Sequence, residues 1–351
     1  MRQSTRQVMV GNVPIGAGAP ITVQSMTNTD TRDIAATREQ IEALAAAGCD
    51  FVRVAVPDQK AAQALSSLVE HSPVPLVADI HFNHRLALRS LEAGVHKLRL
   101  NPGNIGSEDK VREVVKAAQE RKVPIRIGVN SGSVSSALLA RYGRTATAIV
   151  ESALEHIAIF EKLNFFDIVV SLKSTEVEMT VAAYEELSKR VPYPTHIGIT
   201  EAGTKWFGTI KSAAGLGALL SRGLGDTLRV SLTADPVEEV KVGWAILSAL
   251  GLRQRGPVFI SCPTCGRTEI DLEGIAAEVE KRLSDFPLPI TIAVMGCVVN
   301  GPGEARYADL GITGGKGVGL VFRHGQILRK VPETELVDAL VAEANNLLAE
   351  R

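Results

Sequence analysis

Aromatic residues are scarce in this sequence, and neither sign of charge predominates. Phe, Trp and Tyr make up 4% of the 351 residues, and 38 Lys and Arg against 39 Asp and Glu give a formal net charge of −1. So few aromatic side chains offer no stacking surface for single-stranded nucleic acid. Such an evenly balanced charge gives no long-range attraction to nucleic acid or to an anionic membrane. The composition therefore predicts neither kind of partner.

Long apolar runs are also missing. No run approaches the roughly 18 residues of a membrane-spanning helix, although hydrophobic residues make up 45% of the chain. The opening segment, MRQSTRQVMVGNVPIG, has neither the apolar core nor the small-residue cleavage site of a secretory signal. We therefore expect a cytoplasmic protein, in which thiols stay reduced.

Cysteine is rare, and three of the four cysteines are grouped near the end of the chain. SCPTCGRTE holds Cys262 and Cys265, and MGCVVNGPGE holds Cys297 with Glu304 shortly after it. The fourth, Cys49, lies at a helix-to-strand junction and fits a small buried core residue. A disulfide is not expected in a reducing compartment, and a thioredoxin-like pair would leave the third cysteine without a role. The grouping therefore favours a metal site.

Two metals compete for these thiols. Zinc needs a fourth ligand, normally Cys or His, and His324 lies well beyond the third cysteine. An iron–sulfur cluster usually takes four thiolates, so a fourth iron here needs a different ligand. The Gly-Pro-Gly turn allows Glu304 to reach the same centre as an exchangeable oxygen ligand. A zinc site, a free thiol pair and a merely solvated Glu304 are the alternatives.

The first 250 residues alternate short β-branched runs with amphipathic helical stretches. This alternation predicts a parallel sheet, and eight units in about 250 residues fit a closed (β/α)8 TIM barrel better than an open doubly wound sheet. Before the first unit, VMVGNVPIG predicts a hairpin that turns at Gly11-Asn12 and covers the bottom of the barrel. The expected strands span residues 21–26, 51–56, 75–80, 96–101, 124–130, 167–173, 195–201 and 227–232.

A smaller α+β domain is expected after the barrel. LRQRGP is typical of a linker, so the predicted boundaries are 1–252 for the barrel, substrate-binding domain and 253–351 for the second domain. The second domain contains the strands VFIS, ITIAVMG and QILRKV and the helices LEGIAAEVEKRL and ETELVDALVAEANNLLAE. GITGGKG, residues 311–317, does not match P-loop spacing, and we interpret it as a turn. Each cysteine run directly follows a strand.

Charged and polar residues mark the ends of the expected barrel strands, where barrels of this kind carry their active sites. A cation in a buried strand is costly unless it is paired, and here four arginines and one lysine face only two acids. Structural ion pairing is one interpretation. The surplus of positive charge favours a small substrate with more than one phosphate, whose oxygens suit arginine forks. The residues are Arg53, Asp79, His81, Arg99, Asn101, Arg126, Asn130, Lys173, Glu201, Arg229 and Ser231.

Two of these residues are candidates for proton transfer. Glu201 is the better one, because it is a carboxylate at the end of a barrel strand. His81 is either an acid–base group or a hydrogen-bonding neighbour of the site.

Several long motifs resemble those of bacterial 4-hydroxy-3-methylbut-2-enyl diphosphate synthases. The resemblance runs from about residue 5 to the C-terminus, in VQSMTNTDT, VADIHF, LRLNPGNIG, PIRIGVNSGS, GITEAG, GDTLRVSLTADPVEEVKVG, CPTCGRTEID and GCVVNGPGEA. It implies a TIM barrel followed by a domain similar to the cluster-bearing half of sulfite and nitrite reductases. It implies an oxidoreductase of non-mevalonate isoprenoid biosynthesis, which opens and dehydrates 2-C-methyl-D-erythritol 2,4-cyclodiphosphate to (E)-4-hydroxy-3-methylbut-2-enyl diphosphate with two electrons.

The resemblance also implies a cofactor, partners and residue roles. A [4Fe-4S] cluster would be held by Cys262, Cys265, Cys297 and Glu304, and flavodoxin or ferredoxin would supply electrons singly. A head-to-tail homodimer would place the cluster domain of one subunit over the barrel of its partner. Glu201, Glu304 and His81 would be catalytic. The implied substrate-binding residues are Arg53, Asp79, Arg99, Asn101, Arg126, Asn130, Lys173 and Arg229.

Two other classes of protein remain as alternatives. One is a zinc-dependent barrel hydrolase or aldolase acting on a sugar phosphate. The other is an iron–sulfur protein that only carries electrons and has no substrate.

Overall fold

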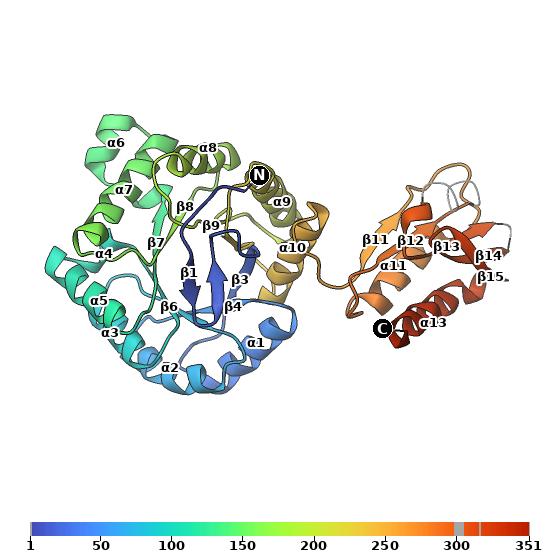
Figure 1. Cartoon of the computed structure of the whole chain (residues 1–351), viewed down its shortest axis with the longest axis horizontal. Coiled ribbons are helices and arrows are strands. Elements are labelled where there is room, and N and C mark those ends of the chain that lie inside the picture. The colour runs from blue at the N-terminus through green and yellow to red at the C-terminus, as the bar shows by residue number, and fades with distance from the viewer. Residues whose placement is uncertain (1, 298–304, 316, 351) are drawn as a thin grey trace. The chain divides into compact units, whose positions relative to one another are not determined.

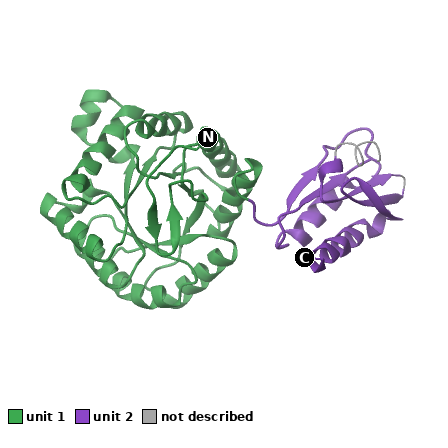
Figure 2. Cartoon of the chain, in the orientation of Figure 1, with its two compact units in different colours: residues 1–253 green, residues 254–351 purple. Residues whose placement is uncertain are grey.

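The chain forms two compact units, residues 1–253 and 254–351 (Figure 1, Figure 2). The computed structural model describes residues 2–297, 305–315 and 317–350. Each unit has its own hydrophobic core.

Eight parallel strands form the sheet of the first unit, in the order β8-β7-β6-β5-β4-β3-β10-β9. A parallel bridge between Val170 and Thr195 brings the two ends of the sheet together, so the barrel is nearly closed. All eight predicted strands are present, although the last two are shorter than predicted. They are β3 (Thr22–Met26), β4 (Phe51–Ala55), β5 (Leu76–Asp79), β6 (Lys97–Leu100), β7 (Ile125–Asn130), β8 (Ile168–Lys173), β9 (His196–Ile197) and β10 (Thr227–Leu228).

Helices surround the barrel (Figure 1). Side-chain caps such as Asp33, Asp58 and Asp235 begin several of them by accepting backbone N–H groups of the first turn. The helices are α1 (Ile34–Ala46), α2 (Gln59–His71), α3 (His84–Glu92), α4 (Pro102–Ile105), α5 (Glu108–Glu120), α6 (Ser136–Tyr142), α7 (Ala146–Lys162), α8 (Val177–Ser188), α9 (Lys205–Ser221) and α10 (Pro236–Ala249), with a short 3-10 helix, η1 (Ser131–Ser133).

Alternate residues of each strand pack outward against these helices. Val52, Leu76 and Leu98, for example, belong to the large core between sheet and helices. Because successive side chains in a strand point to opposite faces, the residues between them line the barrel interior. This pattern decides which side chains can form a site at the C-terminal ends of the strands.

A short hairpin closes the opposite end, as predicted. β1 (Val8–Val10) pairs with β2 (Val13–Ile15), and Val10 and Ile15 pack on Phe51 and Val77 near the N-terminal ends of β4 and β5. We call this end the floor of the barrel and the other end its mouth.

The second unit is a five-stranded mixed sheet with the order β11-β12-β13-β14-β15. The first three strands are parallel and the last two pairs are antiparallel. Its elements are β11 (Val258–Ser261), α11 (Leu272–Leu283), β12 (Thr291–Met295), η2 (Ala305–Tyr307), β13 (Leu310–Gly315), β14 (Val318–Arg323), β15 (Gln326–Pro332), η3 (Glu333–Glu335) and α13 (Leu336–Ala349).

One prediction for this unit was wrong. Residues 311–315, interpreted as part of a turn, lie in β13. Its glycines serve packing instead: a Cβ on Gly311 would lie 2.2 Å from the Phe322 ring, and one on Gly314 would lie 2.3 Å from the side chain of Ile270. Glycine here lets bulky neighbours approach the strand closely.

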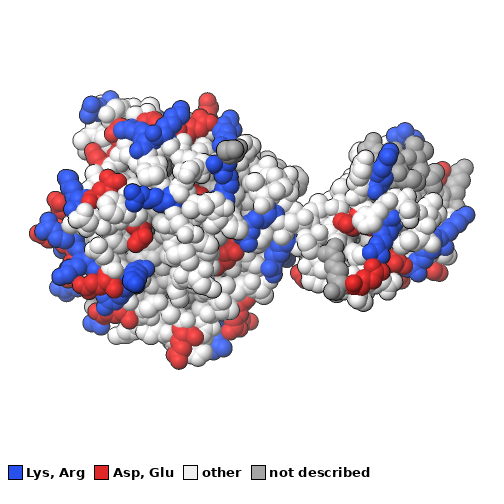
Figure 3. All heavy atoms as spheres, viewed as in Figure 1, with Lys and Arg blue, Asp and Glu red and all other residues white. Residues whose placement is uncertain are grey.

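None of the helices in the described residues is both long and apolar enough to cross a membrane. On the face seen in Figure 3, positive and negative side chains are interspersed. This distribution matches the balanced net charge of the sequence.

Candidate active site

The interior of the barrel toward the mouth is charged. Most of the side chains concerned are at least nine-tenths buried, and Arg229 is partly buried. Six cationic side chains from five strands, two of them on β6, face two carboxylates, Asp79 and Glu239. The six are Arg53, Lys97, Arg99, Arg126, Lys173 and Arg229, the last directly after β10. So much buried positive charge against two acids leaves a surplus that an anion would offset.

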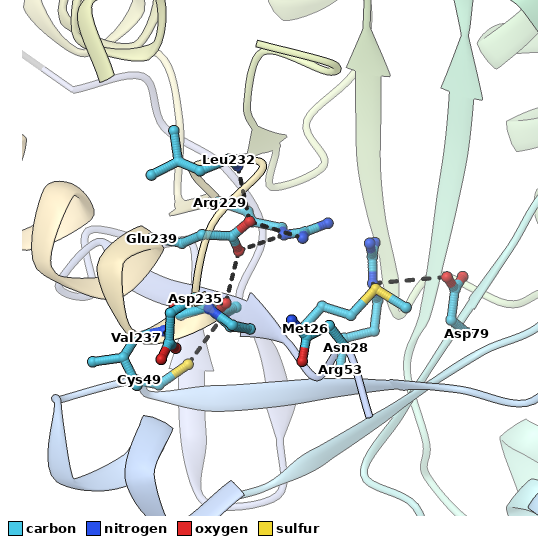
Figure 4. Close-up of polar contacts among 12 residues, drawn as sticks. Met26, Asn28, Cys49, Arg53, Asp79, Arg229, Leu232, Asp235, Val237 and Glu239 are labelled. Atoms are coloured by element: carbon cyan, nitrogen blue, oxygen red, sulfur yellow. Dashed lines mark hydrogen bonds and ion pairs between the residues drawn. The ribbon is translucent and has the colours of Figure 1, made fainter. Parts of the chain in front are cut away.

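Asp79 is paired with two of the arginines. Its Oδ2 lies 3.8 Å from Arg53 Nε (Figure 4), and its Oδ1 lies 3.1 Å from Arg99 Nη1. Burial by itself would raise the pKa of Asp79, but Arg53, the hydrogen bond with His81 and Arg99 together lower it well below its usual value. Asp79 is therefore ionised and neutralises part of the cationic cluster.

Glu239, on α10, is the acid that sequence reasoning missed. Its carboxylate lies 3.2 Å from Arg229 Nη2 and accepts hydrogen bonds from Ser25 Oγ at 2.8 Å and from the Leu232 N–H at 3.0 Å (Figure 4). Glu239 lies on a helix and not at the end of a barrel strand. The sequence did offer one signal for Glu239. It is an acidic residue on the face of an amphipathic helix that also carries the buried residues Pro236, Val240 and Gly243. Glu239 therefore adds a third acid to the two that were predicted for the site, Asp79 and Glu201. It forms an ion pair with Arg229.

Arg126 is the most deeply buried of the arginines. It is 1% exposed, and its Nε and Nη1 have no hydrogen-bond partner within the described part of the chain. Burial lowers its pKa, and the nearby charges of Arg53 and Arg99 lower it further, but a guanidinium keeps its charge at neutral pH. Two donor atoms of a permanent cation are thus directed into the barrel without an acceptor.

Two glycines make room for the cations. A Cβ on Gly128 would lie 2.8 Å from Arg99 Nε, and one on Gly198 would lie 2.6 Å from the Arg229 oxygen and 3.3 Å from Lys173 Nζ. Both glycines are at inward-facing positions, where any larger residue would displace a charged side chain. The interior is therefore shaped around these cations.

The remaining predicted residues lie at or near the mouth. His81 is exposed, and its Nε2 is 3.4 Å from Asp79 Oδ2 and 3.3 Å from Arg99 Nη1. Asn101 is buried, and its Oδ1 accepts the Gly103 N–H at the start of α4. Asn130 ends β7 opposite Lys173 on β8.

Glu201 and Ser231 follow the two shortest strands. Glu201 is exposed after β9 with a φ of +50°, a conformation that is uncommon for a residue other than glycine. Ser231 follows Arg229, and it is half-buried.

Two further interior residues, Lys97 and His196, were missed by sequence reasoning. Lys97 precedes Arg99 by two positions on β6, and His196 is on β9. Both are fully buried. The alternation of inward and outward residues could have revealed that both face the interior. Lys97 lies two positions before Arg99, and His196 lies two positions before the inward-facing Gly198.

The grouped cysteines follow neighbouring strands of the second unit. Ser261 at the end of β11 lies opposite Val294 of β12, so Cys262 and Cys297 come from the same edge of the sheet. Cys262 Sγ accepts the Gly296 N–H at 3.3 Å. Cys265 is exposed, whereas Cys297 is buried.

Arg267 connects the three thiols electrostatically. The charges of Cys265, Cys297 and Cys262 all raise the pKa of this guanidinium, and the hydrogen bonds from Arg267 lower the pKa of the Cys265 thiol. In the described residues no three Cys, His, Asp or Glu side chains converge closely enough to form a metal site as they stand. Three thiols around one cation are nevertheless the donor set that a soft metal centre requires. Glu304 lies outside the described residues.

The fourth cysteine behaves as predicted. Cys49 is buried, and its Sγ accepts the Ser25 N–H at 3.1 Å. Burial raises the pKa of its thiol to about 12, so Cys49 stays protonated and is an inert core residue.

Comparison with known proteins identifies the family. The GcpE TIM-barrel domain matches residues 5–244, and the GcpE protein C-terminal domain matches residues 258–346. A relative from Geobacter sulfurreducens, named 4-hydroxy-3-methylbut-2-en-1-yl diphosphate synthase (flavodoxin), is 62% identical over 352 residues and covers 100% of both chains. The chain belongs to this family. Synthases of the same name from Maridesulfovibrio salexigens and Clostridium perfringens are 59% and 58% identical, covering 100% and 97% of this chain and 98% of each relative.

Two solved structures of other enzymes resemble about 71% of this chain. A Yersinia pestis dihydropteroate synthase matches with a TM-score of 0.51 at 12% identity, covering 71% of this chain and 100% of that one. A Geobacillus kaustophilus 3-dehydroquinate dehydratase matches with a TM-score of 0.50 at 14% identity, covering 71% and 99%. These likenesses show the fold alone. Membership of the synthase family confirms the resemblance found in the sequence and gives no support to a zinc hydrolase or aldolase.

Proposed function

We propose that this chain converts 2-C-methyl-D-erythritol 2,4-cyclodiphosphate into (E)-4-hydroxy-3-methylbut-2-enyl diphosphate, with two electrons delivered singly by flavodoxin. The observation that carries the proposal is the buried cationic surplus at the barrel mouth, in a chain that matches curated synthases along its whole length. A cyclic diphosphate supplies the negative charge that Asp79 and Glu239 do not. The reaction opens the ring by breaking a C–O bond and removes one hydroxyl as water.

The barrel residues bind the diphosphate and stabilise the departing phosphate oxygen. Arg53, Arg99 and Arg126 lie together in the interior, where charge-assisted hydrogen bonds to phosphate are strong. As the C–O bond breaks, negative charge grows on the phosphate oxygen, and fixed cations stabilise that charge without reorganising. Lys173, Asn101, Asn130 and Arg229 are the further substrate-binding residues of the proposal, and Asp79 orients Arg53 and Arg99.

The second unit holds a [4Fe-4S] cluster in this proposal. Cys262, Cys265 and Cys297 supply three thiolates, and Glu304 supplies the fourth ligand. When bound, such a cluster supplies electrons one at a time, as a two-electron reduction fed by a one-electron carrier requires. A carboxylate on the fourth iron is more readily exchanged than a thiolate.

Two residues at the mouth have further roles in the proposal: Glu201 donates a proton, and His81 orients Arg99. Glu201 lies on the exposed loop after β9, where a carboxyl group can donate a proton to the departing hydroxyl. His81, within hydrogen-bonding range of Arg99 and close to Asp79, fixes the arginine and contacts the substrate from the rim.

We propose a head-to-tail homodimer, and the path of the chain as it leaves the barrel supports it. Arg253 donates to the Ile21 oxygen and to Asp50, which precede β3 and β4 at the floor. The chain therefore leaves the barrel unit at the floor, the end opposite the mouth, which supports coverage of the mouth by a partner subunit.

Exposed apolar side chains near the mouth support the same arrangement. Phe82 follows β5 and is 72% exposed, and Trp206 and Phe207, at the start of α9, are 71% and 70% exposed. Ile210, one turn further along α9, is 51% exposed. Trp206, Phe207 and Ile210 lie within the first two turns of α9, and exposed apolar side chains grouped in this way mark a surface that another protein covers. A second copy of this chain fits, because it carries the cluster unit that the barrel needs.

Anaerobic purification and turnover test the proposed function. The holoenzyme should be brown, contain about four irons per chain and convert the cyclodiphosphate when supplied with reduced flavodoxin. Arg126→Met should abolish turnover and keep the iron, whereas Cys265→Ser should lose iron and keep diphosphate binding. A colourless protein that contains zinc, or an iron protein that does not bind the cyclodiphosphate, would refute the proposal. We place the reaction in the cytoplasm, where the thiols stay reduced before iron is inserted.

A further inference from the structure

Lys97 is a buried lysine without a counterion. Its side chain is 0% exposed, and its Nζ has no hydrogen-bond partner among the described residues. Nζ lies 3.9 Å from the centre of the Phe51 ring, which belongs to the floor layer. Because Lys97 is two residues before Arg99 on β6, it lies one layer below the arginines of the mouth.

His196 is in a similar position across the barrel. It is 0% exposed, its Nε2 has no partner in the part of the chain that the structure describes, and its Nδ1 is 3.4 Å from Thr227 Oγ1. Both residues are the first of their strands. We call Lys97 and His196 the inner layer.

Positive groups surround the inner layer. Burial lowers the pKa of Lys97 and of His196 well below the usual values, and Arg126 is the next cause for both. Asp79, on the strand next to that of Lys97, is already paired with Arg99 and Arg53. The charged and titratable groups that line the interior around the layer are Arg53 (β4), Asp79 (β5), Arg99 (β6), Arg126 (β7), Lys173 (β8), Arg229 (after β10), Tyr184 (α8), Glu239 (α10) and, at the rim, His81.

We infer that Lys97 and His196 are further charge-determining residues of the anion site: they lie uncharged in the ligand-free barrel and take up protons when a diphosphate occupies the mouth. The inference rests on the proposed function and adds a property that the mouth arginines cannot have, because an arginine is charged in both states. A proton taken up in this way strengthens binding of a multiply charged anion more than of a singly charged one.

Two opposing effects decide the charge of Lys97. The Phe51 ring favours the ammonium form through a cation–π contact. Burial without an acceptor, next to Arg126 and Arg53, opposes it more strongly. The neutral amine therefore prevails until negative charge enters the mouth. The phosphates then offset the repulsion from the arginines, and the balance changes sign.

Calorimetry of pyrophosphate binding to the holoenzyme tests the inference. The titration is done near pH 7.5 in two buffers of different ionisation enthalpy, so that the buffer dependence of the heat gives the number of protons taken up. Wild type should take up more protons than Lys97→Met or His196→Gln, and the double variant should show the smallest uptake. Affinity should fall roughly tenfold in Lys97→Met, the effect of one charge-assisted hydrogen bond or less.

Three comparisons decide the outcome. Protonation changes of pyrophosphate itself are the same for wild type and every variant. Differences in proton uptake between these proteins therefore come from their side chains. Lys116→Met, which removes an exposed lysine of α5, should leave both uptake and affinity unchanged. Equal proton uptake in wild type and all inner-layer variants, with normal turnover, would overturn the inference alone. Absence of any pyrophosphate or cyclodiphosphate binding would overturn the proposed function with it.

Discussion

Buried basic residues without a described partner are the residues that most directly connect this sequence to its chemistry. A structure built for stability alone would place apolar side chains at Lys97 and Arg126, because burying a polar or charged group without a partner costs up to several kcal/mol. Their presence in the barrel lowers the stability of the ligand-free protein. That cost is offset when an anion binds, so stability and binding should respond to mutation in opposite directions.

Lys97→Met should stabilise the ligand-free barrel and remove a pH dependence. The folded state holds the pKa of Lys97 below the ordinary 10.5. At a pH between the lowered pKa of Lys97 in the folded state and 10.5, the unfolded chain binds one more proton than the folded chain. The unfolding free energy therefore rises with pH, by up to about 1.4 kcal/mol per pH unit. Urea unfolding of the barrel at pH 7 and pH 9 should give a steeper rise for wild type than for Lys97→Met. Parallel pH dependences would contradict a neutral buried Lys97.

Gly128→Ala should disturb the arginine that Asp79 holds. The new Cβ would lie 2.8 Å from Arg99 Nε, so the guanidinium must move away from its ion pair and from the mouth. Loss of one charge-assisted hydrogen bond lowers pyrophosphate affinity roughly tenfold to a hundredfold. Gly217→Ala, in α9, is the control, because its Cβ would meet nothing within 4 Å. Calorimetry that finds equal affinity for both variants would show that Arg99 does not bind the anion.

The residue scale also shows where sequence reasoning reached its limit. Asp79, Arg53 and Arg99 could be grouped because they share the carboxyl ends of adjacent strands, and the structure pairs them. Glu239 could not be found at a strand end, because it reaches the interior from a helix. Lys97 lies too near the start of its strand to suggest a mouth residue. Such positions depend on strand register and tilt, which a single sequence does not fix.

At the scale of elements, local patterns were enough to predict most of the fold. The eight barrel strands, the hairpin and the helices α11 and α13 follow from apolar periodicity, caps and glycine stops, which are properties of short segments. β13 was missed because its glycines indicate a turn locally. Their actual partners, Phe322 and Ile270, lie on other elements. Packing between distant segments overrode the local preference.

The hairpin that forms the floor should be sensitive at its turn. Gly11 has a φ of +59°, and a Cβ there would lie 2.9 Å from the His96 ring and 3.1 Å from Pro75. Gly11→Ala should therefore lower the unfolding free energy of the barrel by more than the roughly 1–3 kcal/mol of backbone strain alone. Gly18→Ala is a matched control, with a φ of +80° and no atom within 4 Å of the new Cβ. If urea unfolding shows that both variants lose the same unfolding free energy, the hairpin turn does not pack tightly against His96 and Pro75.

At the scale of the whole molecule, the chain separates two tasks. One unit concentrates cations for an anionic substrate, and the other gathers three of the four cysteines. Each unit has its own core and can keep its geometry when the other is altered. A reaction that needs both tasks must bring a barrel mouth and a thiol group together, and in the proposed dimer the thiols come from the second subunit.

Mixing two inactive variants distinguishes a shared active site from one within a single chain. Arg126→Met disables the barrel, and Cys265→Ser disables the cluster unit. When the two are co-expressed with different tags, a head-to-tail dimer of one of each contains one intact barrel facing one intact cluster unit. Random pairing makes half of the dimers mixed, and one of their two sites works, so turnover should recover to about a quarter of wild type. If each site used one chain only, every mixture would stay inactive. Recovery should disappear in Trp206→Asp/Phe207→Asp backgrounds, because charge on the exposed rim prevents the partner from docking.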